Sequence, residues 1–414
     1  MRKWIALIAV AALIWTGCPA AWAYETRDEM REAFHVVGDL PEGSPYALQP
    51  TVTAPHDPGT MTEEALEDAL NYLNFLRALA GLEPVERNRL YDSRCQHGAV
   101  LLAALDYADH NAPCPDDMNG DFYESAHLAT TSSNLAKFNW MRPGILREGL
   151  AYFARDDGEA NLHVLGHRRW LLNPAMGETG FGLANSKSGM SYVVMYAHDF
   201  SNDDAQWETV KWPAEGAFPA ELMRRELAWS VSLNPEIYDA AHSYIEVTLR
   251  EETTGLEFSF NCTNGVGDGF CSVNLENYGG PCIIFRPDFA DADFSEYQQN
   301  QRWTVQMTGL RRNDGGTAEL NYAVDMASLY VQEVANIEMS QLEAEMTTGE
   351  TLQLLATVIP AYADDLSLAW SSSDESVATV DDYGNVLAAG PGICEIRAES
   401  ANGRYDFCQV TVIG

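Results

Sequence analysis

The sequence predicts a multidomain chain in which an α+β region is followed by an all-β region and then by a β-sandwich. Three changes of pattern support this division. Leucines recur at steps of three and four between Leu66 and Leu79, which is the period of an amphipathic helix. From Arg169 onward, short apolar runs are broken by Gly, Asn and Pro, which favours strands. From about Ala335, short strands recur at regular intervals, which is typical of a β-sandwich.

Three helices are expected in the α+β region. The first carries the leucine repeat and ends before Gly81 and Pro84, which are normal helix stops. The second is expected over about 90–106, with Asp92 or Ser93 as its N-cap. The third is expected to begin near Pro143, because proline is favoured in a first helical turn, and to end near Gly158.

Strands are expected to follow these helices. The runs "WLLNP" (170–174), "TGFGLA" (179–184) and "SYVVMYA" (191–197) fit short strands, so helices followed by a small sheet predict a compact α+β layer structure. Because side chains alternate along a strand, we expect Arg168 and Arg169 to point to opposite faces. One could then reach a carboxylate near a cavity, and the other would lie in solvent.

The N-terminus has the pattern of a secretory signal peptide. Arg2 and Lys3 precede an apolar run at 5–15, and "AWA" (21–23) is a small-x-small cleavage site. Cys18 raises a lipoprotein signal as the rival, and cleavage before Tyr24 is favoured over it. No other run is apolar and long enough to cross a membrane. The chain is therefore expected to be secreted or displayed on the cell surface.

Composition narrows the classes of partner. The chain has 414 residues and a net charge of −36, with 61 acidic and 25 basic residues. Phosphate backbones and anionic lipids would be repelled, which argues against a nucleic-acid partner. At about 150 residues per domain, the length after the signal suggests two or three domains. The expected divisions are a signal peptide at 1–23, an extended N-terminal segment at 24–60, an α+β domain at 61–204, a β-rich domain without an assigned role at 205–332, and a β-sandwich at 335–414.

The last of these segments has an immunoglobulin-like strand pattern with Trp370 as its expected core residue. The stretch "WSSSDESVATVDDYGNVLAAGPGICEIRAES" resembles the bacterial immunoglobulin-like group 2 domain. The resemblance covers about the last 80 residues. It implies an extracellular spacer or adhesive module and does not imply catalysis.

The 61–200 region resembles the CAP superfamily, which comprises cysteine-rich secretory proteins, antigen 5 and pathogenesis-related proteins and is also called SCP. The resemblance rests on "LNYLNFLRALAGLEPV", a histidine after the second helix, "SSNLA" and "GHRRWLLNPAMGETGFGLA". It implies an α–β–α sandwich around a cavity. Two histidines and two acidic residues face that cavity in the family, and some members hold a divalent metal on the histidines.

Carried onto this chain, the resemblance assigns His110 as the first histidine and His167 as the second. Ser133 stands where the first acid is usual, and Asp156, three residues after Phe153, fits the second. Glu148 is the alternative to Asp156. His110 and His167 are the expected ligands of a divalent metal such as zinc, and Asp156 could supply a third.

Other interpretations of these residues stay open. The two histidines could instead fix loops by hydrogen bonds. Ser132 or Ser133 with a histidine and Asp156 would supply the residue types of a serine hydrolase, but the nucleophile-elbow motif is absent. Serine at position 133 cannot replace a titratable carboxylate, which argues against hydrolysis.

The favoured function is extracellular or cell-surface binding or adhesion by an exported, monomeric CAP-domain protein. The alternative is a metal-assisted hydrolase acting in the CAP cavity, so the sequence leaves open whether the chain is an enzyme.

Seven cysteines follow the signal, an odd number in a chain expected to be oxidised. Cys394 and Cys408 are expected to face the sandwich core from one hairpin. They could form a disulfide only if the register places them opposite each other.

Overall fold

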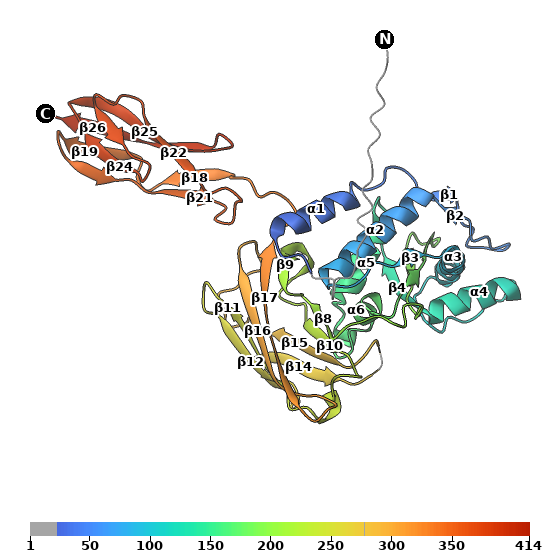
Figure 1. Cartoon of the computed structure of the whole chain (residues 1–414). Coiled ribbons are helices and arrows are strands. Elements are labelled where there is room, and N and C mark those ends of the chain that lie inside the picture. Colours follow the sequence, from blue (N-terminus) through green and yellow to red (C-terminus); the bar gives the residue numbers. More distant parts are fainter. Residues whose placement is uncertain (1–22, 277) are drawn as a thin grey trace, which may run out of the picture. The chain divides into compact units, whose positions relative to one another are not determined.

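The computed structural model describes residues 23–276 and 278–414, which divide into two compact units (Figure 1). The first unit comprises the chain up to Phe218 together with Leu222–Ser295 and Arg302–Asp325. The second comprises Pro219–Glu221, Glu296–Gln301 and Met326–Gly414. The expected signal peptide and Cys18 lie outside the described residues. The region expected to be a separate β-rich domain therefore belongs largely to the same compact unit as the helices.

The helices lie in the first unit. They are α1 (Arg27–Val37), α2 (Glu63–Leu79), α3 (Arg89–Leu105), α4 (Gly120–Thr131), α5 (Ile145–Arg155) and α6 (Gly166–Leu171).

Helix α1 corrects the expectation that 24–60 is extended throughout. Thr26 and Glu29 form a capping box, in which each side chain accepts a hydrogen bond from the other residue's backbone amide. Met30 and Val37 of this helix are buried. The Thr-x-x-Glu signal was present in the sequence and predicts this helix start.

The N-cap of α3 differs from expectation, and one further helix was not expected. Asn88 caps α3, whereas Asp92 or Ser93 was expected, because the Asn88 side chain accepts from the amides of Leu90 and Tyr91. Helix α4 was not expected, and Asn119 caps it in the same manner.

A three-stranded antiparallel sheet lies among the helices, in the order β4 (Ser133–Phe138), β7 (Ser191–Tyr196) and β6 (Phe181–Asn185). Helix α3 lies so close to one face that a Cβ at Gly182 would overlap the backbone of Cys95. On β7, Val194 packs with the α3 cluster, whereas Val193 meets Gly149 of α5. Because adjacent strand residues point to opposite faces, helices pack on both faces of this sheet.

The segment 166–171 is a helix, so the expected strand at 170–174 is wrong. Both Arg168 and Arg169 are buried, and neither lies in solvent. The guanidinium of Arg168 donates to the carbonyls of Ala154, Arg155 and Ala228. Such carbonyl partners come from distant parts of the chain, which local strand patterns do not reveal. The runs at 179–184 and 191–197 are strands, as expected.

The β-rich part of the first unit contains two larger sheets. One has the order β14-β15-β10-β8 and the other β13-β12-β11-β16-β17-β9. Their aromatic side chains meet: the ring centroid of Trp229 on β10 is 6.0 Å from Phe285 on β15 and 6.3 Å from Trp303 on β16. The strands are β8 (Thr209–Trp212), β9 (Gly216–Pro219), β10 (Trp229–Leu233), β11 (Glu246–Glu251), β12 (Glu257–Asn261), β13 (Val266–Gly267), β14 (Gly269–Asn274), β15 (Cys282–Pro287), β16 (Arg302–Arg311) and β17 (Thr317–Ala327).

Two short pairs complete the first unit: β1 (Tyr46–Leu48) with β2 (Thr60–Met61), and β3 (Glu86–Arg87) with β5 (Glu178–Thr179).

The second unit is a set of small sheets around an apolar core. Strands β19-β26-β25-β22 form one sheet, β20-β24-β23 a second and β18-β21 a third. The strands are β18 (Asn336–Met339), β19 (Glu343–Thr347), β20 (Thr351–Gln353), β21 (Ala356–Ile359), β22 (Leu368–Ser372), β23 (Ala378–Val380), β24 (Asn385–Ala388), β25 (Gly392–Ser400) and β26 (Tyr405–Ile413). Trp370, expected in the core, packs against it but is only partly buried.

The register of the β25–β26 hairpin shows whether Cys394 and Cys408 lie opposite each other. Cys394 and Cys408 both face the core, as expected. Cys394 lies opposite Val410, and Cys408 lies opposite Ile396, so the two cysteines are diagonal rather than opposed. Both are free thiols in this structure.

Candidate functional site

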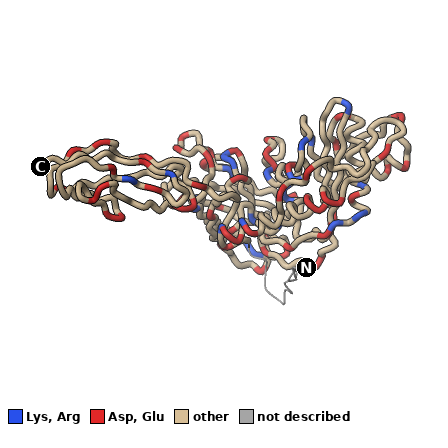
Figure 2. The backbone as a smooth tube through the Cα atoms, turned by 90° about the horizontal axis from the view of Figure 1, so that it is seen from above, with Lys and Arg blue, Asp and Glu red and all other residues tan. Residues whose placement is uncertain are grey.

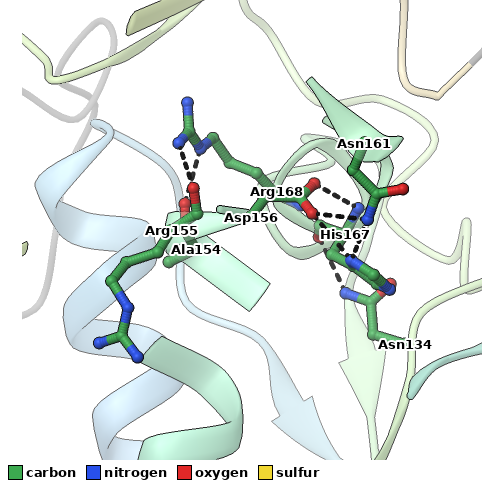
Figure 3. Close-up of polar contacts among 7 residues, drawn as sticks. All are labelled: Asn134, Ala154, Arg155, Asp156, Asn161, His167 and Arg168. Carbon is green, nitrogen blue, oxygen red and sulfur yellow. Dashed lines mark hydrogen bonds and ion pairs between the residues drawn. The ribbon is translucent and has the colours of Figure 1, made fainter. Parts of the chain in front are cut away.

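Helix α6 places His167 beside Asp156, which ends α5 in a left-handed conformation (Figure 3). The imidazole Nδ1 lies 2.9 Å from Asp156 Oδ1, and the backbone amide of His167 donates to Oδ2 at 3.0 Å. Asn161 also donates to Oδ1, at 2.9 Å, and the Arg168 amide reaches Oδ2 at 3.3 Å. The Asp156 side chain is only 1% exposed. A carboxylate from one helix end thus fixes the ring of the next helix.

This arrangement defines what the pair can do chemically. With Nδ1–H donating to Asp156, Nε2 carries the lone pair that can accept a proton or bind a metal. Both oxygens of Asp156 are already occupied by hydrogen bonds. Asp156 is therefore placed to orient His167 and is poorly placed to be the third metal ligand.

Strand β4 contributes neighbouring residues to opposite sides of the sheet. Asn134 donates from its side chain to the carbonyl oxygen of His167 at 2.8 Å. The Ser133 hydroxyl instead lies 3.9 Å from the Cys95 thiol of α3. The serine considered as a nucleophile therefore faces α3, whereas its neighbour Asn134 reaches the histidine.

His110 and His198 both form hydrogen bonds with backbone carbonyls of the segment 130–132. The His110 ring meets the Thr130 carbonyl oxygen through Nδ1 at 2.8 Å, and the His198 amide donates to the Ser132 carbonyl at 3.1 Å. Burial of the His198 ring and the nearby His110 lower the pKa of His198 below its ordinary value. Sequence analysis missed His198, and its only sequence signal was a histidine directly after a strand.

Glu148, the alternative acid, does not join His167. Its carboxylate pairs with Arg155 at 3.0 Å and with Arg142 at 3.7 Å. In the described residues, no group of three or more His, Cys, Asp or Glu side chains is arranged to hold a metal ion. The two imidazoles alone suit zinc chemically but would hold it weakly, so the expected metal site stays a prediction.

Four rings from three chain segments meet around α6, and we call them the aromatic surface: Trp170, His198, Phe200 and Tyr278. The Trp170 ring centroid lies 4.3 Å from that of His198, 6.0 Å from Phe200 and 5.7 Å from Tyr278. Phe200 is 54% exposed, and His198 is also exposed. Tyr278 comes from the loop between β14 and β15, so the β-rich region adds a ring beside α6.

Buried arginines fix α6 and that loop. Arg169 donates to the carbonyls of Glu276 and Gly280, both at 2.6 Å, and its guanidinium lies 4.9 Å from the Tyr278 ring centroid. Arg77 of α2 donates to the carbonyls of Leu171 and Asn173 at the end of α6. Desolvation lowers the pKa of Arg77 to about 9 and that of Arg168 to about 10, which leaves both charged at neutral pH.

A pocket of about 410 Å³ lies elsewhere in the first unit, between the 41–45 segment and the first turns of α2 and α5. Asp68 lines it, and Arg147 holds Asp68 in an ion pair. His110, His167 and Asp156 are not among its lining residues. The histidines considered as a functional site therefore do not line this pocket.

Acidic residues are distributed along both units, as the red positions on the backbone in Figure 2 show. Among the described residues, every helix falls short of the length and apolarity that crossing a membrane requires.

Comparisons with known proteins concern mainly short parts of the chain. Lacto-N-biosidase of Bifidobacterium bifidum is 44% identical over 64 residues, which are 16% of this chain and 6% of that enzyme. The A type blood N-acetyl-alpha-D-galactosamine deacetylase of Flavonifractor plautii is 33% identical over 75 residues, or 17% of this chain and 10% of that one. The minor capsid protein of Enterobacteria phage T3 is 32% identical over 121 residues, or 28% and 27%. This chain thus spans a small share of each relative's length.

Among solved structures, an intimin mutant of EHEC O157:H7 is 19% identical over 18% of this chain and 45% of that one, with a TM-score of 0.16. Domains 4 and 5 of the S-layer protein SbsC are 14% identical over 27% and 65%, with a TM-score of 0.18. Residues 333–405 match the family described as bacterial Ig-like domain (group 2). The C-terminal part of the chain is therefore a bacterial Ig-like domain of group 2.

Proposed function

We propose that this chain is an exported protein that binds an extracellular or cell-surface component through a CAP-type region at 61–204. The observation that carries the proposal is the His167 site: a Gly-His segment whose imidazole is oriented by Asp156, beside a sheet with helices on both faces. The CAP resemblance assigns His167 as the second histidine and Asp156 as the second acid. A group 2 Ig-like domain at 333–405 supports an extracellular setting.

The relatives support this setting. Two of them have names that denote action on glycans, the lacto-N-biosidase and the N-acetyl-galactosamine deacetylase. The likeness covers less than a fifth of this chain in each case, so it does not transfer an activity. It is a likeness of a short segment to parts of two proteins whose names denote action on glycans, and it motivates testing glycan-bearing surfaces.

The test is binding of the purified full chain to mucin-coated plates and to intact bacterial cells. We expect saturable binding that persists at raised salt, because a chain of charge −36 gains little from charge attraction to such surfaces. Absence of saturable binding to both surfaces contradicts the proposal. Tyr383→Ala provides a control, because Tyr383 is 79% exposed and lies in the second unit.

A metal-assisted hydrolase is the second candidate, and the Asp156–His167 contact favours it. A carboxylate that fixes the Nδ1–H tautomer makes Nε2 a better base or ligand. His110 and His167 would hold a divalent ion such as zinc, which when bound supplies Lewis-acid polarisation. Ser133 stands where the family has its first acid and cannot replace a titratable carboxylate, so binding remains the favoured function.

Metal analysis and a general peptidase assay separate the two candidates. Near-stoichiometric zinc, together with cleavage that His167→Ala abolishes and Tyr383→Ala preserves, would favour the hydrolase. A metal-free protein that still binds mucin or cells would favour binding.

A further inference from the structure

Buried hydrogen-bonding groups hold the aromatic surface in place, although two of its rings, His198 and Phe200, are exposed. Asp199 lies between His198 and Phe200, is only 5% exposed, and anchors both through its carboxylate. Its Oδ2 accepts from the amides of Gly177 and Glu178, both at 2.9 Å, and from Ser201 Oγ at 2.6 Å. Burial alone would raise the pKa of Asp199, but these hydrogen bonds together lower it. The carboxylate is therefore charged and holds the ring-bearing segment in one conformation.

The third segment of the surface is fixed as firmly. Arg169 is buried and holds the loop of Tyr278 through the carbonyls of Glu276 and Gly280 and through Asn274 Oδ1 at 2.7 Å. Its guanidinium also lies over the Tyr278 ring. Two independent buried charges, one negative and one positive, thus order the segments that carry the exposed rings of His198 and Phe200 and the partly buried ring of Tyr278. Rings ordered before a ligand arrives bind with a smaller loss of entropy.

The geometry points to a neutral glycan as the ligand of the aromatic surface, and we propose this ligand class; the inference rests on the proposed extracellular binding function. Sugar rings carry apolar C–H faces that stack on aromatic rings, and hydroxyl groups that need hydrogen-bond partners at the edges. His198, Asp203 and Asp204 are exposed within a few residues of Phe200 and can supply such partners. The surface thus combines apolar faces with polar edges.

Other ligand charges fit less well. The net charge of −36 and the exposed Asp203 and Asp204 disfavour an anionic glycan or an anionic lipid surface. A quaternary ammonium ion needs rings that surround an open space. Here the rings pack directly on Trp170, and Arg169 already occupies one side of Tyr278. A neutral, flat-faced ligand avoids both conflicts.

The experiment uses the full chain on an array of neutral and anionic oligosaccharides, with mucin binding measured in parallel. We expect binding to at least one neutral glycan that Phe200→Ala weakens about tenfold or more, equivalent to 1.4 kcal/mol. Phe200→Tyr keeps the ring and should retain binding. Tyr383→Ala is the matched control, an exposed aromatic residue in the second unit. Because Phe200 is already exposed, its replacement should not unfold the protein.

Several outcomes overturn the inference. It fails if Phe200→Ala and Trp170→Ala bind the array as the unaltered chain does, if only anionic glycans bind, or if choline displaces the bound glycan. If the chain binds mucin or cells but no neutral glycan on the array, the glycan inference fails while the proposed binding function stands. If the unaltered chain binds neither mucin, nor cells, nor any glycan on the array, the proposed function itself is contradicted.

Discussion

Helix α6 and the β25–β26 hairpin bury side chains of opposite character: charged in the helix and apolar in the hairpin. The hairpin buries Cys394, Ile396, Ala398, Cys408, Val410 and Val412, which are apolar and alternate with exposed residues. Helix α6 buries two adjacent arginines whose guanidinium groups donate to backbone carbonyls from several other segments. Burial in the hairpin follows the alternation of apolar residues along each strand, whereas burial of the α6 arginines requires hydrogen-bond acceptors from other parts of the chain. Substitutions should therefore have different costs in the two regions.

The largest effect is expected for Arg168→Ala. The change leaves the carbonyls of Ala154, Arg155 and Ala228 without a buried donor, so we expect a loss of about 3–5 kcal/mol in the free energy of unfolding. Urea denaturation followed by tryptophan fluorescence measures it, because Trp212, Trp229 and Trp303 are buried in the first unit.

Arg397→Ala in the second unit is the comparison for that change. Arg397 pairs with Glu399 at 2.9 Å, and its side chain is 37% exposed, so its loss should cost less than about 1 kcal/mol. Equal costs for the two arginines would break the contrast between the regions.

A smaller but clear loss is expected for Ile396→Ala in the hairpin. Ile396 is fully buried, and large-to-small changes at such positions cost about 2–4 kcal/mol. Ile393 lies on the same strand and is 63% exposed, so Ile393→Ala should cost only a few tenths of a kcal/mol. Thermal unfolding of the second unit, followed by the fluorescence of Trp370, compares the two variants.

A third prediction concerns pH and Asp92. Burial raises the pKa of Asp92 to about 6, despite hydrogen bonds from Phe181 and Arg87 that lower it. The folded state therefore holds a proton that the unfolded state, with a pKa of about 3.9, has lost. The free energy of unfolding should fall by about 2 kcal/mol as pH rises from about 4 to 6, and Asp92→Asn should remove most of this slope.

Asp374 in the second unit should behave with the opposite sign. Hydrogen bonds from Ser376 lower its pKa, so its contribution is present above the unfolded pKa and is lost as pH falls. Asp374→Asn therefore serves as the control, and urea denaturation of both variants between pH 3 and 7 checks the two signs. If the free energy of unfolding of Asp92→Asn still fell between about pH 4 and 6 as in the unaltered chain, the fall could not be assigned to Asp92.

The smallest effect is expected for the His110–His198 pair. Partial burial and His110 lower the pKa of His198, so His110→Ala should raise that pKa toward its ordinary value. Titration of the histidine ring signals by NMR measures this change. An unchanged His198 pKa would mean that burial alone explains the lowering.

These contrasts explain how far the sequence could predict the molecule. The strands of the second unit, the leucine-rich α2 and the inward-facing Cys394 and Cys408 follow from local periodicity. The α6 helix did not, because "WLLNP" fits a strand until Arg77, Arg168 and Arg169 are seen to bind distant carbonyls. His167 with Asp156 was found from a family pattern, and the structure brings them together. His198 was missed, since only the folded chain places it beside Trp170 and near His110.

The donors of Arg168 and Arg169 also bear on how such a gene can be rearranged. Their partners Ala228, Glu276 and Gly280 lie in the β-rich region, so a fragment that ended near residue 204 would deprive both buried guanidinium groups of acceptors that they have in the full chain. A recombinant protein that joined this helical region to an unrelated β-rich region would thus be expected to fold less stably. The core cluster of the group 2 domain takes its buried side chains from between Met339 and Val412, so a transferred copy of that segment would carry its own core with it.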